Sequence, residues 1–409
     1  MCSGVVGRAR RFVYCSCVLS LGFLTLALSA CGSDYSVAGG GGGAGTSGSF
    51  DARELQEPAF VPTSEGEKIL VYEILVENVE GAANKVYELS VEDASGARIA
   101  TYSGSDLQAM TRVFGSGITK VEGDAIPEGG GALILIYLRF SEADDVLPTT
   151  LQHSLTLAGG DGDPVTTETF TVGIDRTPPV VVSAPVHGGR WIMDGAIGPA
   201  SYHRSATLPL GGQFWVPERY AIDFEVIDDR GFFLDAAGDK PTAQEMANVE
   251  NWHAYGLDVV SATAGTVVTV LDGLDDAIPP DPPTGLSEEQ IGGNHVVVDM
   301  GDGNYAFYAH MIKGSIVVSV GDTLSVGDTI GKIGNTGNSF GPHLHFHVIN
   351  GPDPLRGFGV PYVIDGYVDR GLAQGTPDDI LGGTVSWDPD TPQTEITNRL
   401  PSINRVVDL

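Results

Sequence analysis

Residues 334–347 read Gly334-Asn-Thr-Gly-Asn-Ser-Phe-Gly-Pro-His343-Leu-His345-Phe-His347. In a β-strand, residues i, i+2 and i+4 project from the same face, so three imidazoles would lie side by side. Neutral imidazole is a common metal ligand, and two ring nitrogens on one face suit a tetrahedral Zn²⁺. A solvated strand face is the plainer interpretation. Three histidines in five positions, in a chain with nine, favour a metal site.

Several segments upstream extend this pattern. They are Tyr220-Ala-Ile-Asp223-Phe, Ala264-Gly-Thr-Val268, Gly293-Asn294-His-Val-Val-Val, Tyr308-Ala-His310-Met, Val318-Ser-Val-Gly-Asp322 and Val326-Gly-Asp-Thr-Ile-Gly331. In this order, and with the histidine segment, they resemble the lysostaphin/LytM-type zinc metallopeptidases. The resemblance implies a LytM-like antiparallel β peptidase domain, expected over residues 186–370, with a groove above the metal.

The resemblance also implies roles for individual residues. Asp223 and His345 would be zinc ligands, and His310 and His343 would lie beside the metal as catalytic residues that handle protons. A zinc ion with three protein ligands keeps an open position for water, and a nearby imidazole can move a proton at neutral pH. We expect Tyr308, Asn335 and Arg219 to line the substrate groove.

One position departs from the family pattern. The family usually has a histidine four residues before the ligand aspartate, and this chain has Arg219 there. A guanidinium stays protonated and cannot bind zinc. Either the site is degenerate or another histidine completes it. We predict His203, which lies before a Glu218-Arg-Tyr-Ala-Ile-Asp223 segment similar to that of divergent family members. His347 lies one further step along the strand face, which makes it the weaker candidate.

The segment before this domain predicts a second β unit. Residues 65–183 contain short alternating runs, such as Tyr87, Leu89 and Val91 on one face, separated by Gly/Asp turns. The fold class is therefore mainly β, with an immunoglobulin-like β-sandwich followed by the LytM-like domain. We interpret the sandwich as a spacer or adhesion module and His153 as a half-exposed strand residue. Residues 371–409, rich in Asp, Pro and Thr, are expected to be an irregular acidic tail.

The first 30 residues are typical of a secretory signal. A basic start is followed by an apolar run and then by Leu28-Ser-Ala-Cys31, which resembles the lipobox of bacterial lipoproteins. The resemblance implies cleavage before Cys31 and attachment of lipid to it. An ordinary signal peptide is the alternative. Gly32, where inner-membrane lipoproteins have Asp, favours the outer membrane. Residues 31–64 then form a tether, Gly/Ser-rich in its first part.

Composition excludes some classes of function. The net charge of −31 makes nucleic acid a poor partner, and 42% hydrophobic residues exclude a disordered chain. We therefore predict a Zn²⁺-dependent endopeptidase that hydrolyses peptide cross-links of peptidoglycan at the cell envelope. The alternative is a degenerate LytM-like domain that binds the wall or activates other wall hydrolases. A lipoyl- or biotinyl-type carrier is disfavoured because no lysine occupies a Met-Lys-Met-type hairpin.

Overall fold

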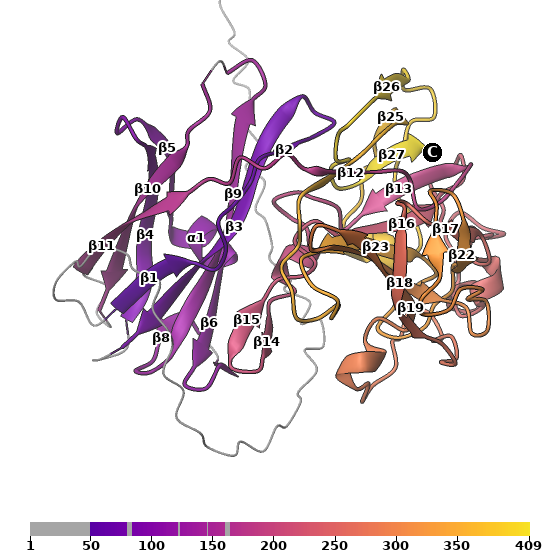
Figure 1. The fold of residues 1–409 in the computed structure, drawn as a ribbon, viewed down its shortest axis with the longest axis horizontal. Coiled ribbons are helices and arrows are strands. Elements are labelled where there is room, and N and C mark those ends of the chain that lie inside the picture. The colour runs from indigo at the N-terminus through magenta and orange to yellow at the C-terminus, as the bar shows by residue number, and fades with distance from the viewer. Residues whose placement is uncertain (1–49, 80–83, 122, 145, 160–163) are drawn as a thin grey trace, which may run out of the picture. The chain divides into compact units, whose positions relative to one another are not determined.

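Antiparallel β-strands dominate the computed structural model, which describes residues 50–79, 84–121, 123–144, 146–159 and 164–409 (Figure 1). The predicted signal peptide, Cys31 and the Gly/Ser-rich part of the tether lie outside the described residues. The prediction of a mainly β protein with two successive β regions is confirmed. Within the described residues, no helix is both long enough and apolar enough to span a bilayer.

The N-terminal β unit, residues 50–174, contains two sheets. The first has the order β1-β3-β9-β6-β7, with β2 beside β3, and the second has the order β11-β10-β4-β5, with β8 beside β4. The elements are β1 (Phe50–Glu54), β2 (Val61–Pro62), β3 (Glu67–Asn78), β4 (Asn84–Asp93), β5 (Arg98–Ser103), α1 (Gly104–Met110), β6 (Thr111–Gly115), β7 (Thr119–Lys120), β8 (Ala125–Ile126), β9 (Gly131–Ser141), β10 (Thr150–Ala158) and β11 (Pro164–Gly173).

Residues from both sheets share one apolar core, which includes Tyr72, Leu89, Val91 and Leu155. Tyr87 does not share this core face as expected. An irregularity in the pairing of β4 with β10 between Thr156 and Leu157 shifts the alternation, and Tyr87 is exposed. The expectation for His153 is wrong, because its ring is buried in this core and its Nε2 lies 2.8 Å from the Tyr72 hydroxyl. Whether the unit is immunoglobulin-like stays a prediction.

Strand β3 is buried on both of its faces. Leu70, Tyr72 and Ile74 pack into the core of the N-terminal unit. The alternate residues Ile69 and Val71 instead belong to the core of the C-terminal region. A strand with one polar face would leave those positions in water, so β3 is shared between two cores.

The C-terminal region is built on one ten-stranded sheet with the order β21-β18-β19-β20-β23-β16-β13-β27-β25-β26. Its strands are β13 (Arg190–Asp194), β16 (Ile222–Val226), β18 (Gly265–Leu271), β19 (Asn294–Gly301), β20 (Asn304–Met311), β21 (Thr323–Leu324), β23 (Leu344–Ile349), β25 (Tyr367–Leu372), β26 (Thr394–Ile396) and β27 (Arg405–Asp408). Paired outside it are β12 (Val180–Val182) with β24 (Tyr362–Ile364), β14 (Leu208–Leu210) with β15 (Gln213–Trp215), and β17 (Asp258–Val260) with β22 (Thr329–Lys332).

Short helices connect these strands. They are η1 (His203–Ser205), α2 (Ala243–Met246), η2 (Val249–Asn251), η3 (Glu288–Gln290) and α3 (Pro377–Leu381). Two of the expected boundaries need correction. Residues 371–409 are not an irregular tail, because β27 pairs with β13 and β25 inside the ten-stranded sheet. The expected tether, residues 31–64, includes β1 and β2, and both pair with β3.

Candidate metal centre

Three adjacent strands bring the predicted site residues together. Asp223 on β16 pairs directly with His345 on β23, which in turn pairs with Ala309 on β20. His345 Nδ1 lies 2.8 Å from Asp223 Oδ1. Both side chains are buried. The alternation of β23 thus aims His345 at the aspartate that the sequence singled out, although residues 223 and 345 are far apart in the chain.

His203 completes a cluster with these two residues. It lies on the single turn η1, and its Nε2 is 3.3 Å from Asp223 Oδ2. Its Nδ1 lies 3.0 Å from the Gly195 carbonyl, to which only an N–H can donate. Gly195 has a φ of +59°, and a Cβ there would lie 2.6 Å from both His203 and Tyr202. The close approach of this turn to the histidine therefore needs glycine.

The chemistry of these atoms calls for a cation between them. Since His203 Nδ1 carries a proton, Nε2 of the neutral ring is an acceptor that faces a carboxylate oxygen, also an acceptor. A proton or a metal ion between them removes this repulsion. Burial lowers the pKa of His203, but Asp223, Glu218 and the Gly195 carbonyl together raise it by more, to about 9. Burial likewise raises the pKa of Asp223, but the neighbouring His203 and His343 hold it well below its ordinary value.

The geometry suits a metal ion in the place of that proton. One nitrogen or oxygen from each of His203, Asp223 and His345 lies within 4.8 Å of the others. His345 Nδ1 is free to bind a metal when its Nε2–H donates to His347 Nδ1, which is 2.9 Å away. Two histidines and one carboxylate are a donor set typical of catalytic zinc sites, so the residues fit Zn²⁺.

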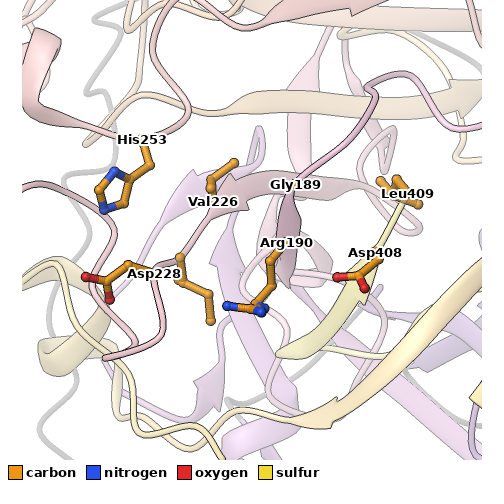
Figure 2. A pocket seen from close by; sticks show the side chains of 8 residues that line it. Gly189, Arg190, Val226, Asp228, His253, Asp408 and Leu409 are labelled. Atoms are coloured by element: carbon orange, nitrogen blue, oxygen red, sulfur yellow. The ribbon is translucent and has the colours of Figure 1, made fainter. Parts of the chain in front are cut away.

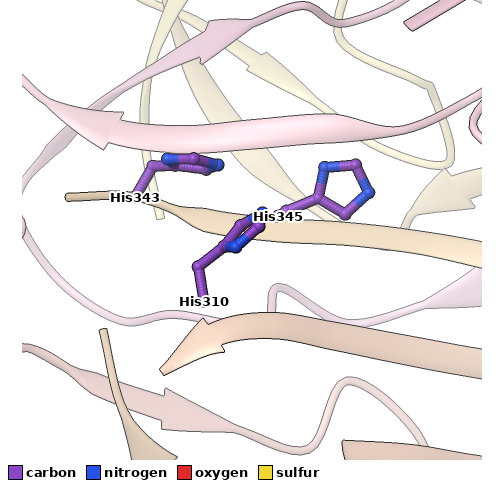
Figure 3. Close-up of side chains that lie close together, drawn as sticks. All are labelled: His310, His343 and His345. Carbon is purple, nitrogen blue, oxygen red and sulfur yellow. The ribbon is translucent and has the colours of Figure 1, made fainter. Parts of the chain in front are cut away.

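His310 and His343 lie beside this cluster. Their ring centroids are 4.8 Å apart, and His310, His343 and His345 gather in one place (Figure 3). His343 Nε2 is 3.4 Å from Asp223 Oδ1. Nδ1 of His310 lies 2.7 Å from the Thr336 carbonyl and Nδ1 of His343 lies 2.7 Å from the Gly341 carbonyl. Each ring therefore holds its proton on Nδ1 and leaves Nε2 as the atom that can accept a proton.

The electrostatics keep both rings neutral. Burial lowers the pKa of His310 well below its ordinary value, with a further contribution from His343. Burial also lowers the pKa of His343. Two neutral imidazoles whose Nε2 atoms carry no proton can act as general bases at neutral pH.

The backbone of His310 is strained. Its φ is +66°, a left-handed conformation that side chains with a Cβ rarely adopt. The pairing of β19 with β20 is irregular between Asn294 and Val296, where β20 has one extra residue. This bulge turns His310 out of the regular alternation, and the conformation is held by hydrogen bonds from His310 N–H to Gly292 and from Gly334 N–H to His310. Such strain concentrates at functional sites.

Sequence reasoning missed two acids and one tyrosine at the centre. Asp194 on β13 pairs directly with Asp223, and the Tyr202 hydroxyl donates to Asp223 Oδ2 at 2.6 Å. Burial, together with Asp223, raises the pKa of Asp194 to about 6. Glu225 is also buried, and within the described chain its Oε2 has no hydrogen-bond partner. The i, i+2 spacing of Asp223 and Glu225 was the one available signal.

The other histidines are not part of the cluster. His347 contacts His345 and, like His295, packs against the Phe307 ring in a tilted arrangement. His253 lines an open hollow of about 640 Å³ together with Arg190, Asp228 and Asp408 (Figure 2). None of the five clustered residues lines that hollow.

The three expected groove residues are buried. Tyr308 and Asn335 have no exposed surface, and Arg219 is 3% exposed. The Tyr308 hydroxyl accepts a hydrogen bond from Ala262 N–H. Asn335 donates to the Ala277 carbonyl and accepts from Ser339, which lies 3.3 Å from His343 Nδ1. Asn335 thus supports the loop that carries His343, and none of the three offers a surface to a substrate in this structure.

Comparisons with known proteins bear on the C-terminal region. Residues 251–356 match the family description Peptidase family M23. The peptidoglycan DD-endopeptidase ShyA of Vibrio cholerae is 44% identical over 57 residues, and an uncharacterized metalloprotease of Buchnera aphidicola is 41% identical over 56 residues. Each match covers 14% of this chain, and the matched stretches span 13% and 14% of those proteins.

Solved structures of peptidases also resemble the chain. The lysostaphin catalytic domain from Staphylococcus simulans has 22% identity and a TM-score of 0.22, covering 42% of this chain and 86% of that one. The EnpA catalytic domain from Enterococcus faecalis has 20% identity and a TM-score of 0.25, covering 44% and 93%. The family match contains His310, His343 and His345, whereas His203 and Asp223 precede it. The C-terminal region of this chain therefore contains a stretch, residues 251–356, that is similar to the M23 peptidases.

Proposed function

We propose that this protein is a zinc-dependent endopeptidase that hydrolyses peptide cross-links of peptidoglycan at the cell envelope. The convergence of His203, Asp223 and His345 beside His310 and His343 carries the proposal. Three buried ligand side chains and two neutral imidazoles whose Nε2 atoms carry no proton are the parts that hydrolysis of an amide requires.

The chemistry divides between the ligands and the two neighbouring histidines. His203, Asp223 and His345 would hold Zn²⁺, and the bound ion would supply a Lewis acid that lowers the pKa of water to about 7 and polarises the scissile carbonyl. His310 Nε2 and His343 Nε2 are the atoms that accept the proton of the water and return it to the leaving amine. The carbonyls of Thr336 and Gly341 hold the two rings in the tautomer that this task needs.

The substrate class is proposed from the names of the relatives and not from the geometry of the site. ShyA, which shares the matched stretch, is named a peptidoglycan DD-endopeptidase. Peptidoglycan peptides are therefore the substrate class that we propose. A lipid on Cys31 would hold the enzyme in the envelope, on the outer membrane, where that substrate lies. The composition, at −31 net charge, suits no nucleic acid partner.

Arg219 stands where the family usually has a histidine ligand, and this substitution is the argument for a degenerate domain that binds the wall or activates other hydrolases. The guanidinium cannot bind zinc, but His203 brings an imidazole to Asp223 from a different segment. The geometry therefore favours the enzyme.

Zinc content and hydrolysis test the proposal together. We expect about one zinc per chain by elemental analysis and release of cross-link peptides from isolated peptidoglycan, detected by mass spectrometry. The His203→Ala variant should lose both. The matched control is His253→Ala, which removes a histidine at the separate hollow and should keep both. A parent protein that binds no zinc after supplementation, and releases no peptides, would support the binding or regulatory alternative.

A further inference from the structure

Each of the two ligand segments that precede the family match carries a buried arginine. Arg204 follows His203 directly, and Arg219 lies four residues before Asp223. Both arginines are 3% exposed. Neither turns toward the cluster of ligands. Both guanidinium groups contact the N-terminal β unit.

Arg219 is bound by an acid of that unit. Its Nε and Nη2 donate to the two carboxylate oxygens of Glu73 at 3.2 and 2.5 Å, and Nη1 donates to Gln56 at 2.8 Å. Glu73 has no exposed surface. It continues the face of β3 on which Ile69 and Val71 pack into the C-terminal core. A charge this deeply buried is stable only with its partner, so the pair specifies where Arg219 must lie.

Arg204 is held by the neighbouring strand. Its Nη2 donates to the Ile136 carbonyl on β9 at 2.7 Å, and its guanidinium carbon lies 5.4 Å from the centre of the Tyr137 ring. The same turn receives a further contact, because Arg112 on β6 donates to Ser205 Oγ at 3.2 Å. The turn η1 has only three residues, and these contacts attach it to the N-terminal β unit.

We infer that the N-terminal β unit positions the metal centre, with Arg204 holding the turn that carries His203 and Arg219 holding the segment that carries Asp223. This inference rests on the proposed function, since it assigns the parts that orient two of the proposed ligands. Arg204, Arg219 and Glu73 are positioning residues. The unit is then a required part of the centre rather than a spacer.

Binding of Co²⁺ to the full chain tests this inference without an activity assay. The affinity is measured by competition with a chelator, and the visible d–d absorption bands report the coordination geometry. We expect Arg204→Met and Glu73→Gln to weaken binding by about tenfold or more and to change the bands, as losses of groups that orient ligands do. The double variant Glu73→Met/Arg219→Met removes both buried charges together and should also change the bands.

Leu155→Ala is the matched control. It opens a cavity in the core of the N-terminal unit without touching either arginine. If it is folded by circular dichroism, it should keep the affinity and the bands of the parent. If the Arg204→Met variant and the double variant are folded and keep the affinity and bands of the parent, the inference is overturned. The proposed function then still stands. A parent chain that binds no Co²⁺ would overturn the proposed function, and this inference with it.

Discussion

The two halves of the metal centre are held in different ways. His310 on β20, His343 just before β23 and His345 on β23 lie within the family match. The rings of His310 and His343 are oriented by carbonyls of residues 336 and 341. His203 and Asp223 lie before the match, and the arginines beside them contact residues 136 and 73 of the N-terminal unit. The first half is supported from within the C-terminal region, and the second half is in addition contacted by the N-terminal unit.

This difference explains how the family motif and the missing histidine can coexist. A strand that carries alternating histidines needs only its neighbours to orient them. A ligand supplied by a three-residue turn needs support from elsewhere, because so short a helix has little stability of its own. Arg204 contacts the N-terminal unit from that turn, and Arg219, which stands where the family has a histidine, contacts it from the segment that carries Asp223.

The largest expected effect is on catalysis, at a histidine of the matched half, which is the half of the centre inside the family match. His343→Ala should lower the rate of peptide release by about 10²- to 10⁴-fold, as expected for loss of a general acid or base. Its zinc content should stay near that of the parent, because His203, Asp223 and His345 remain. Kinetics with elemental analysis checks both. Loss of zinc as well would show that His343 belongs to the ligands.

In the unmatched half, which is the half that precedes the family match, the expected effect is on the free energy of unfolding. Glu73→Ala leaves Arg219 buried without its carboxylate, which should cost about 3–5 kcal/mol of unfolding free energy. Urea denaturation measures this loss. Glu73→Met/Arg219→Met should recover most of it, since no unpaired charge remains. If the single variant is as stable as the parent, the ion pair does not join the two regions.

A pH series tests the burial of His153, a histidine outside the candidate metal centre. Burial lowers the pKa of His153 to about 4 from 6.5, so the unfolded chain binds this proton first. The stability from neutral His153 is therefore complete above pH 6.5 and is lost as the pH falls toward 4, a change of about 3 kcal/mol. Unfolding free energies at about pH 7.5 and about pH 4.5 should show this loss. The double variant Tyr72→Phe/His153→Leu lacks this imidazole, so most of the loss of stability between the two pH values should disappear. If the variant loses as much unfolding free energy as the parent, the assignment of the loss to His153 is contradicted.

The smallest effect is expected at the surface of the N-terminal unit. Arg98 and Glu92 form an ion pair at 2.6 Å, with side chains 52% and 33% exposed. Arg98→Ala should change the unfolding free energy by no more than about 1 kcal/mol, because water screens exposed pairs. The difference between the losses of unfolding free energy in Arg98→Ala and Glu73→Ala measures how much burial contributes to the effect of an ion pair. A loss as large as that of Glu73→Ala would remove the contrast.

The matched half could be predicted from the sequence because its information is local. The alternation at His343 and His345 and the motif around His310 each lie in a few residues. Asp223 was recognised in the same way, and His203 by its place before Glu218. The bulge that turns His310 was not predictable, since it depends on how β19 pairs with β20.

The remaining features depend on contacts between distant residues. Glu73 and Arg219 are 146 positions apart, and no local pattern links them. The same holds for β27, whose Asp-, Pro- and Thr-rich surroundings suggest irregular structure. Its two apolar residues, Val406 and Val407, are buried between β13 and β25. The assignment of residues 371–409 as a tail was wrong because composition does not reveal pairing with residues 190–192.

The place of β27 also has a consequence for the order of assembly during synthesis. Strand β13, which pairs with the Asp223 strand on one side, pairs on its other side with residues 406–408 of β27. A ribosome makes residues 190–194 more than two hundred positions earlier. The sheet beneath the centre therefore stays open until residue 408 has emerged, and partly made chains should lack a finished centre.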